Sequence, residues 1–135
     1  MKALIVGTQR DQVTKAQWEP FFYYRKQLKQ ELGLEIQTQI AETFSEIAQV
    51  CQANPSDVIF MIPFWRENAN EAESAIAPIK QTNPQRKVIF IDPWAQASSR
   101  YFNLLPYVDY FLKRQRYSHL ENYHKNFLGG TMLTD

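Results

Sequence analysis

The 135-residue sequence has one cysteine, two histidines and four glycines, and each scarcity excludes a class of protein. A lone Cys51 cannot form an intramolecular disulfide, and an apolar helical pattern around it predicts a small core residue rather than a nucleophile. His119 and His124 have no cysteine or acidic cluster beside them to complete a metal site. Gly7 stands alone after the first apolar segment, which excludes a dinucleotide fingerprint and a P-loop. We therefore expect no metal and no cofactor.

The sequence also lacks an excess of either charge and any long apolar run. Fifteen Lys and Arg against fourteen Asp and Glu leave a formal net charge of +1, which indicates no nucleic-acid partner. The longest uninterrupted apolar stretch, VIFMIPFW at residues 58–65, falls far short of the ~20 residues of a membrane span. Polar residues follow MKALIV too soon for a signal peptide. These patterns predict a cytoplasmic protein with no membrane span.

Short apolar segments alternate with longer segments of 3.6-residue periodicity from one end of the chain to the other. This alternation predicts one α/β domain over residues 1–135, a three-layer sandwich around a five-stranded parallel sheet. We expect strands at residues 2–7, 34–41, 57–62, 87–91 and 107–112, and helices at residues 15–32, 43–52, 68–81, 94–104 and 117–127. Gly33 suits the end of the first helix, and Thr43 with Glu46 has the spacing of a capping box.

The side-chain pattern of each strand predicts its place in the sheet. The segment 34–41 alternates apolar and polar residues, so one of its faces meets water and it belongs at an edge. Asp109 inside the segment 107–112 makes that strand the second edge. The flavodoxin-like order 2-1-3-4-5 is therefore favoured, and the Rossmann-like order 3-2-1-4-5 is the alternative.

Two strands end in nearly the same residues, VIFMIPFW from Val58 and VIFIDPWA from Val88, with an offset of 30 positions. This offset is one strand-helix period, so the copies predict successive strands that deliver Pro and Trp to one edge of the sheet. Asp92 stands where the first copy has Ile62. Before Pro93 it suits the N-cap of a helix, and at a strand end it also suits a catalytic or ligand-contacting carboxylate.

Ligands of open α/β sheets bind beyond the carboxyl ends of the strands, so residues there are candidates for a site. Trp65 and Trp94 could stack on a planar or sugar ring. Arg10 and Arg66 could hold a phosphate or carboxylate with paired N–H donors, and Lys113 follows the fifth strand. We expect substrate binding by Arg10, Trp65, Arg66, Trp94 and Lys113, with Asp92 as the candidate catalytic residue.

A phosphoryl-accepting receiver domain has the same five-unit layout. It carries an acidic pair after the first strand, an Asp at the end of the third and a Lys at the end of the fifth. Lys113 matches this pattern, but Gly7 and Thr8 replace the acidic pair and Ile62 replaces the acceptor. A working phosphoryl acceptor is therefore not expected.

The sequence resembles the amino-terminal, acceptor-side domain of glycosyltransferases of the two-Rossmann (GT-B) type, a cyanobacterial group in particular. The features that carry the resemblance are KALIVGT at the start, YYR at residues 23–25, IDPW after the fourth strand, YVDYFLKRQ at residues 107–115 and GGTMLTD at the end. It implies a sugar or other small-molecule acceptor, a second domain or partner protein, and no activity by this chain alone. Asp92 would then deprotonate the acceptor hydroxyl.

The alternative function is a non-catalytic binding or protein-interaction module, receiver-like or flavodoxin-like in fold. Such a module would work through an exposed helix face, and the run Phe21-Phe22-Tyr23-Tyr24 is the candidate. The run also fits a helix packed into the core.

Overall fold

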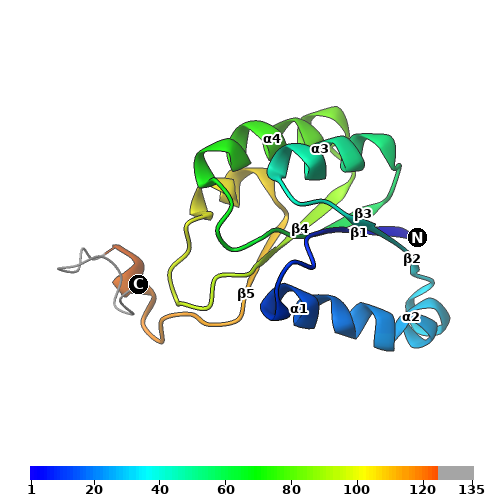
Figure 1. The fold of residues 1–135 in the computed structure, drawn as a ribbon, viewed down its shortest axis with the longest axis horizontal. Helices are drawn as coiled ribbons and strands as arrows, with labels where there is room; N and C mark the ends of the chain where they lie inside the picture. The colour runs from blue at the N-terminus through cyan, green and yellow to red at the C-terminus, as the bar shows by residue number, and fades with distance from the viewer. Residues whose placement is uncertain (125–135) are drawn as a thin grey trace.

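The computed structural model describes residues 1–124 and shows a parallel β-sheet with helices on both faces (Figure 1). The strands are β1 (Lys2–Gly7), β2 (Glu35–Ile40), β3 (Val58–Ile62), β4 (Lys87–Asp92) and β5 (Tyr110–Lys113). Their order is β2-β1-β3-β4-β5, and all neighbours are parallel. The flavodoxin-like order is confirmed, and the Rossmann-like alternative is wrong.

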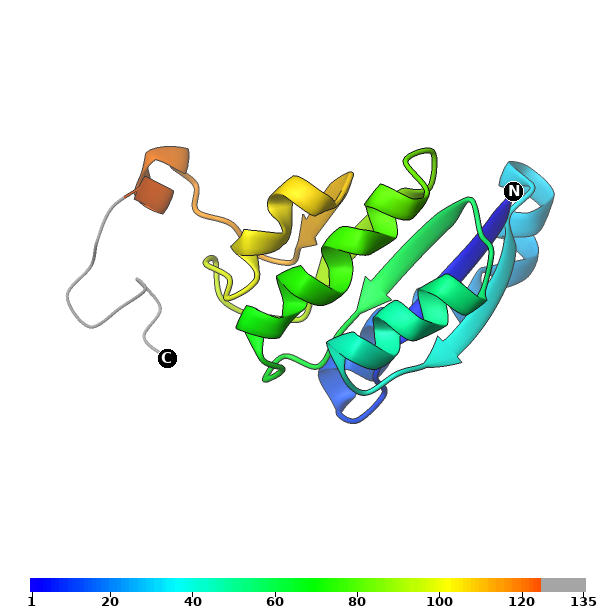
Figure 2. The same cartoon turned by 90° about the horizontal axis from the view of Figure 1, so that it is seen from above.

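One face of the sheet is covered by α3 (Phe44–Ala53), α4 (Ala69–Thr82) and the 3-10 helix η1 (Phe102–Tyr107), as Figures 1 and 2 show. Alternate residues of β1, β3 and β4 point to this face and are buried. The core there contains Phe44, Ile47, Ile76, Phe90 and Tyr101. Cys51 belongs to it as predicted, and burial raises the pKa of its thiol to about 12 although Arg86 opposes the shift.

The other face is covered by α1 (Gln12–Tyr23) and α2 (Arg25–Leu32), which lie over β1, β2 and β3. The predicted helix 15–32 is thus two helices, interrupted at Tyr24, and it begins earlier. The early start comes from Asp11, whose Oδ1 accepts a hydrogen bond of 2.9 Å from the backbone N of Thr14. Gly33 ends α2 in the left-handed region, as expected.

The capping box before α3 is confirmed in one half only. The backbone N of Glu46 donates to Thr43 Oγ1 at 3.2 Å, but the Glu46 carboxylate accepts from the backbone N of Glu42 instead of that of Thr43, at 2.6 Å.

The aromatic run of residues 21–24 is buried only in part. Phe21 packs on Phe60 with ring centroids 4.8 Å apart, whereas Phe22, Tyr23 and Tyr24 are exposed.

Two predicted helices after β4 are wrong. Residues 94–101 are irregular and only the short η1 follows, because the segment is held by tertiary contacts such as the hydrogen bond of 3.0 Å from the Tyr101 hydroxyl to Phe64 O. In place of a helix over 117–127 there is the 3-10 helix η2 (Leu120–His124). The rest of that prediction lies outside the described residues.

Asp109 immediately precedes β5 and links this edge strand to α4 and β4 by hydrogen bonds. Its carboxylate accepts hydrogen bonds from Lys80 Nζ at 2.6 Å, Lys87 Nζ at 3.1 Å and the backbone N of Val88 at 2.9 Å. Burial alone would raise the pKa of Asp109, but these three donors outweigh it and lower the pKa to about 2. The charge predicted at the sheet edge is therefore paired.

The depressed pKa of Asp109 predicts how stability depends on pH. The unfolded chain binds the proton near pH 3.9, so this carboxylate stabilises the fold above that pH and the contribution is lost as pH falls toward 2. Urea unfolding at pH 6 should find Asp109→Asn less stable by roughly 1–2 kcal/mol. The difference from the wild type should shrink at pH 2.5. Glu31→Gln, on the exposed surface of α2, is the control, and a difference independent of pH would contradict the assignment.

Candidate functional site

The candidate residues follow the carboxyl ends of β1, β3, β4 and β5, which parallel pairing brings to one edge of the sheet. Three neighbouring parts of this edge differ in what they can do. They are the β1–β3 corner, the ion pair between β4 and β5, and an aromatic cleft between the loops after β3 and β4.

The β1–β3 corner is closed by direct backbone contact. Gly7 has φ +153°, and a Cβ there would overlap the carbonyl oxygen of Ile62. That oxygen accepts a hydrogen bond of 3.0 Å from the backbone N of Thr8, and the Ile62 side chain is fully buried. Thr8 is buried too, and its hydroxyl donates to Glu42 Oε2 at 2.8 Å. Gly7, Thr8 and Ile62 themselves offer no carboxylate at this corner.

Asp92 and Lys113 form a buried ion pair across the ends of β4 and β5. Their charged atoms are 2.7 Å apart, and the side chains are 0% and 9% exposed respectively. The second carboxylate oxygen accepts from the backbone N of Trp94 at 3.0 Å, and Lys113 Nζ also donates to Trp94 O at 3.3 Å. Asp92 thus caps a turn and not the helix predicted after it. With both oxygens occupied, this environment suits a structural carboxylate better than a general base.

The aromatic cleft brings three predicted residues together. The ring centroids of Trp65 and Trp94 lie 5.4 Å apart, and the guanidinium of Arg66 lies 4.1 Å from the Trp65 ring centre. Arg100, which sequence reasoning missed, lies 5.6 Å from the centre of the Trp94 ring. The cleft has a volume of about 600 Å³ and is lined by Asp11, Gln12, Val13, Trp65, Arg66, Pro93, Trp94, Ala95 and Gln96.

Asp11 also lines the cleft, and sequence reasoning did not include it among the candidates. Its Oδ1 caps α1, while its Oδ2 is buried without a hydrogen-bond partner in the described part of the chain. The signal in the sequence was the spacing of Asp11 and Thr14, which is that of an N-cap and the residue it caps. Because α1 begins at Gln12, close to the carboxyl end of β1, Asp11 lies at the same edge of the sheet as the strand ends.

Two predicted binding residues lie outside this cleft. Arg10 pairs with Glu42 at 3.0 Å and with Glu67 at 3.9 Å, and it covers the Phe64 ring at 4.8 Å. Burial raises the pKa of Glu67, as do three nearby carboxylates, and Arg10 opposes the rise. Arg10 therefore neutralises a group of acids. Lys113 lines a neighbouring cavity of about 410 Å³ instead, on the side of β5.

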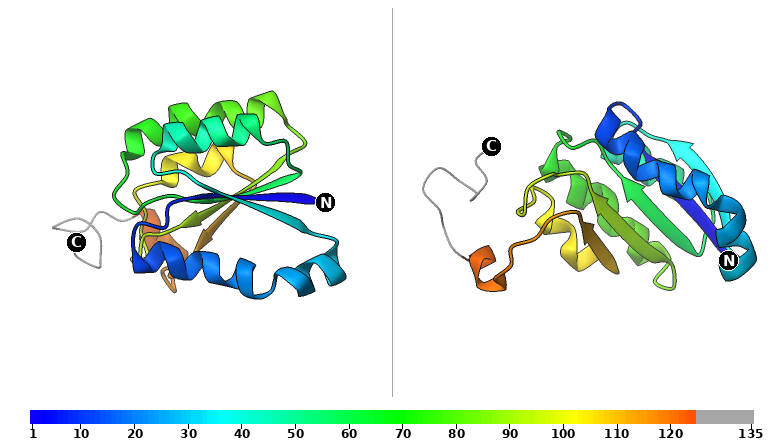
Figure 3. Two further views of the ribbon diagram at one scale, coloured as in Figure 1. Left: turned by 45° about the vertical axis from the view of Figure 1, so that its right-hand side comes forward. Right: turned by 90° about the horizontal axis from the view of Figure 1, so that it is seen from below.

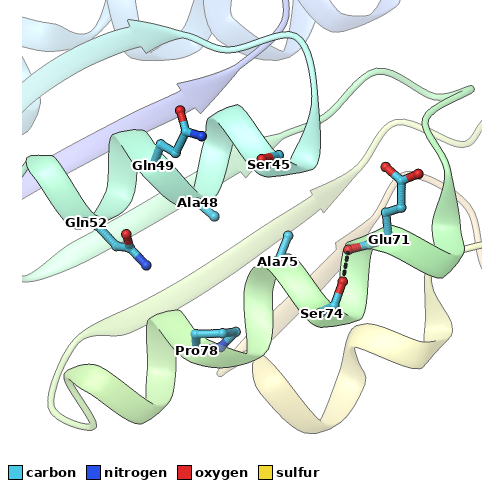
Figure 4. A pocket seen from close by; sticks show the side chains of 8 residues that line it. All are labelled: Ser45, Ala48, Gln49, Gln52, Glu71, Ser74, Ala75 and Pro78. Atoms are coloured by element: carbon cyan, nitrogen blue, oxygen red, sulfur yellow. Dashed lines mark hydrogen bonds between the residues drawn. The ribbon is translucent and has the colours of Figure 1, made fainter.

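A further hollow, of about 370 Å³, lies between α3 and α4, along the length of the two helices (Figure 4). Small side chains such as Ala48 and Ala75 leave this space, and Ser74 uses its hydroxyl on its own helix, at Glu71 O. Residues 1–124 contain no group of three His, Cys, Asp or Glu side chains placed to hold a metal ion. No helix in the same range is long and apolar enough to cross a membrane.

No family model and no curated protein sequence matches this chain. The solved structures that share its fold include two response-regulator structures. One is the response regulator TrrA from Thermotoga maritima, solved in complex with Mg²⁺ and BeF, with a TM-score of 0.54 and 19% identity over 85% of this chain and 88% of that one. The other is the non-phosphorylated receiver domain of HemR from Leptospira biflexa, with a TM-score of 0.51 and 15% identity over 92% and 89%. Identities this low show the fold and nothing beyond it.

The predicted relation to a glycosyltransferase domain is wrong, since the similar structures are receivers. Two of the motifs that suggested it are structural here: KALIVGT is β1 with its closed corner, and IDPW ends β4 at the ion pair. GGTMLTD lies outside the described residues. In YYR, Arg25 donates to Ile36 O at 2.7 Å and ties α2 to β2. The role of Asp92 as base toward a sugar hydroxyl falls with that relation. The chain has the flavodoxin-like fold of receiver domains, with Gly7, Thr8 and Ile62 where a phosphoryl acceptor needs carboxylates.

Proposed function

We propose that this chain is a receiver-like binding module without phosphoryl transfer, and that it holds a small planar, anionic ligand at Trp65, Trp94 and Arg66. The observation that supports it most is the contrast between two parts of one edge. The β1–β3 corner is closed by Gly7 against Ile62, while the cleft beside it is open and lined by aromatic and cationic groups.

The residues of the cleft determine which ligand fits. Tryptophan faces stack on planar rings. Arg66 lines the cleft beside Trp65 and takes part in no ion pair among the described residues, so its charge is free to bind a carboxylate or phosphate. Asp11 Oδ2 adds one acceptor for an N–H or O–H group. A volume of about 600 Å³ suits a molecule of nucleotide size.

The absence of phosphoryl transfer is tested with a small phosphodonor. The full chain incubated with acetyl phosphate and Mg²⁺ should gain no phosphoryl group by intact mass spectrometry, because Ile62 occupies the acceptor position and Lys113 is paired with Asp92. The receiver domain of HemR, treated in the same way, is the comparison. A phosphorylated aspartate or glutamate in this chain would overturn the proposal.

Ligand binding is tested by calorimetry on the full chain with nucleoside monophosphates and aromatic carboxylates. For a probe that binds, Trp94→Ala and Arg66→Gln should each weaken binding about tenfold or more, equivalent to about 1.4 kcal/mol. Arg116→Gln, an exposed arginine outside the cleft lining, is the matched control and should have no effect. Binding that survives both cleft substitutions, or no binding of any probe, would contradict the proposed site.

A further inference from the structure

The second face of the sheet is covered over half of its width only. Parallel sheets are normally covered by helices on both faces, because their strands are apolar on both. Here α1 lies over β1 and β3, and no helix among residues 1–124 covers β4 and β5 on that side (Figure 3, right). An apolar surface is therefore left without its usual layer.

The uncovered strands present large apolar side chains to this side. Ile89 and Ile91 of β4 extend the core under α1 and are half-buried. In register beside them on β5 are Tyr110 and Leu112, which are 59% and 47% exposed. These four side chains form the floor of a groove, which we call the open groove.

Helix α1 forms the wall of the open groove. Val13, Ala16, Gln17 and Pro20 recur at the spacing i, i+3, i+4, i+7, which is one flank of a helix. The first three line the cavity of about 410 Å³ together with Ile91 and Leu112. Because most of these wall residues are small, a second helix could lie close beside α1 and cover the floor.

The described residues after β5 leave the open groove uncovered. Tyr123 of η2 donates to Ala97 O at 3.0 Å and packs on the ring of Phe102, which belongs to η1. Because η1 packs with α4 on the opposite face of the sheet, these contacts hold η2 away from the floor. Residues 1–124 therefore supply no cover for the open groove.

The charges around the open groove indicate the nature of that layer. Arg114 lines the cavity at the carboxyl end of β5, and none of the ion pairs of residues 1–124 involves it. The acid of the neighbouring segment, Asp92, is already neutralised by Lys113. We propose that the open groove docks an amphipathic helix of a partner protein, with its apolar stripe on β4 and β5 and an acidic residue against Arg114. This proposal does not depend on a ligand in the aromatic cleft.

The test uses a synthetic peptide of 18 residues with Leu at i, i+3, i+4 and i+7, Glu near one end and a fluorophore, titrated with the full chain. A peptide of the same composition with the Leu stripe scrambled is the peptide control. We expect saturable binding of the amphipathic peptide only. Leu112→Asp should weaken it at least tenfold, and Arg114→Glu about threefold or more at low salt.

Leu105→Asp is the matched control, since Leu105 is 51% exposed on η1, on the opposite face, and should leave the affinity unchanged. Circular dichroism checks that each variant is folded. Equal binding of both peptides, or equal affinities of Leu112→Asp and Leu105→Asp, would overturn the proposal. Two other occupants of the open groove would also overturn the proposal. If a second copy of the chain occupies it, the protein should form a concentration-dependent dimer that Leu112→Asp abolishes. If the chain's own end occupies it, the double variant Phe127→Ser/Leu128→Ser should bind the peptide more tightly than the wild type does.

Discussion

Replacing Gly7 by alanine should destroy the stable fold. The new Cβ would overlap the backbone carbonyl of Ile62 in β3, and φ +153° is a conformation that residues with a side chain rarely adopt. Neither β1 nor β3 can move aside, because their neighbours Val6 and Met61 are fully buried in the core. We expect the free energy of unfolding to fall by at least about 4 kcal/mol, which is a large part of the stability of such a domain.

Gly33→Ala is the matched control for this experiment. Gly33 also has positive φ, +63°, but a Cβ there would meet nothing within 4 Å. The unfavourable backbone conformation alone should then lower the free energy of unfolding by roughly 1 kcal/mol. Urea unfolding followed by circular dichroism measures both values. Similar losses for the two variants would show that backbone conformation and not the contact with Ile62 sets the effect at Gly7.

Replacing Lys113 by methionine should have the second largest effect. The Asp92 carboxylate, on a side chain that is 0% exposed, would lose its only cationic partner in the described residues, 2.7 Å away. Removing one member of a buried pair leaves the desolvated charge uncompensated, which costs roughly 3–5 kcal/mol. We expect the urea midpoint of Lys113→Met to fall accordingly.

Two further variants separate the buried charge from simple loss of contacts. In Asp92→Asn/Lys113→Met the charge is gone while a side-chain oxygen can still accept from the backbone N of Trp94, so the double variant should be more stable than Lys113→Met alone. Lys87→Met removes a lysine that is 61% exposed in its pair with Asp109 and should cost less than about 1 kcal/mol. A Lys113→Met cost as small as that of Lys87→Met would show that water screens the Asp92 pair.

Local patterns were sufficient to predict the layers and the strand order. The alternation of Leu34, Ile36 and Thr38 with polar residues placed β2 at an edge, and Leu34 and Ile36 are indeed buried while their polar neighbours are exposed. The doubly apolar strands were correctly placed inside the sheet. Such patterns succeed because a strand buried on one face alternates apolar and polar residues, whereas a strand buried on both faces is apolar throughout.

Segments held by tertiary contacts were predicted poorly. Residues 94–104 have apolar spacing that suits a helix, but the backbone there is held by particular partners, such as Tyr101, whose hydroxyl donates to Phe64 O at 3.0 Å. The site was predicted in part for the same reason. Trp65, Arg66 and Trp94 do meet, whereas Arg10 is drawn away by Glu42 and Glu67, which come from other parts of the chain.

For this protein the sequence alone determined the α/β class, the order 2-1-3-4-5 and the missing carboxylates of a phosphoryl acceptor, since each depends on residue type at a strand position. Only the tertiary structure decided that Asp92 is neutralised by Lys113, that Asp11 faces the cleft, and that β4 and β5 lack a covering helix among the described residues. Those facts depend on distances between residues far apart in the chain, and pairwise electrostatics and packing vary steeply with such distances.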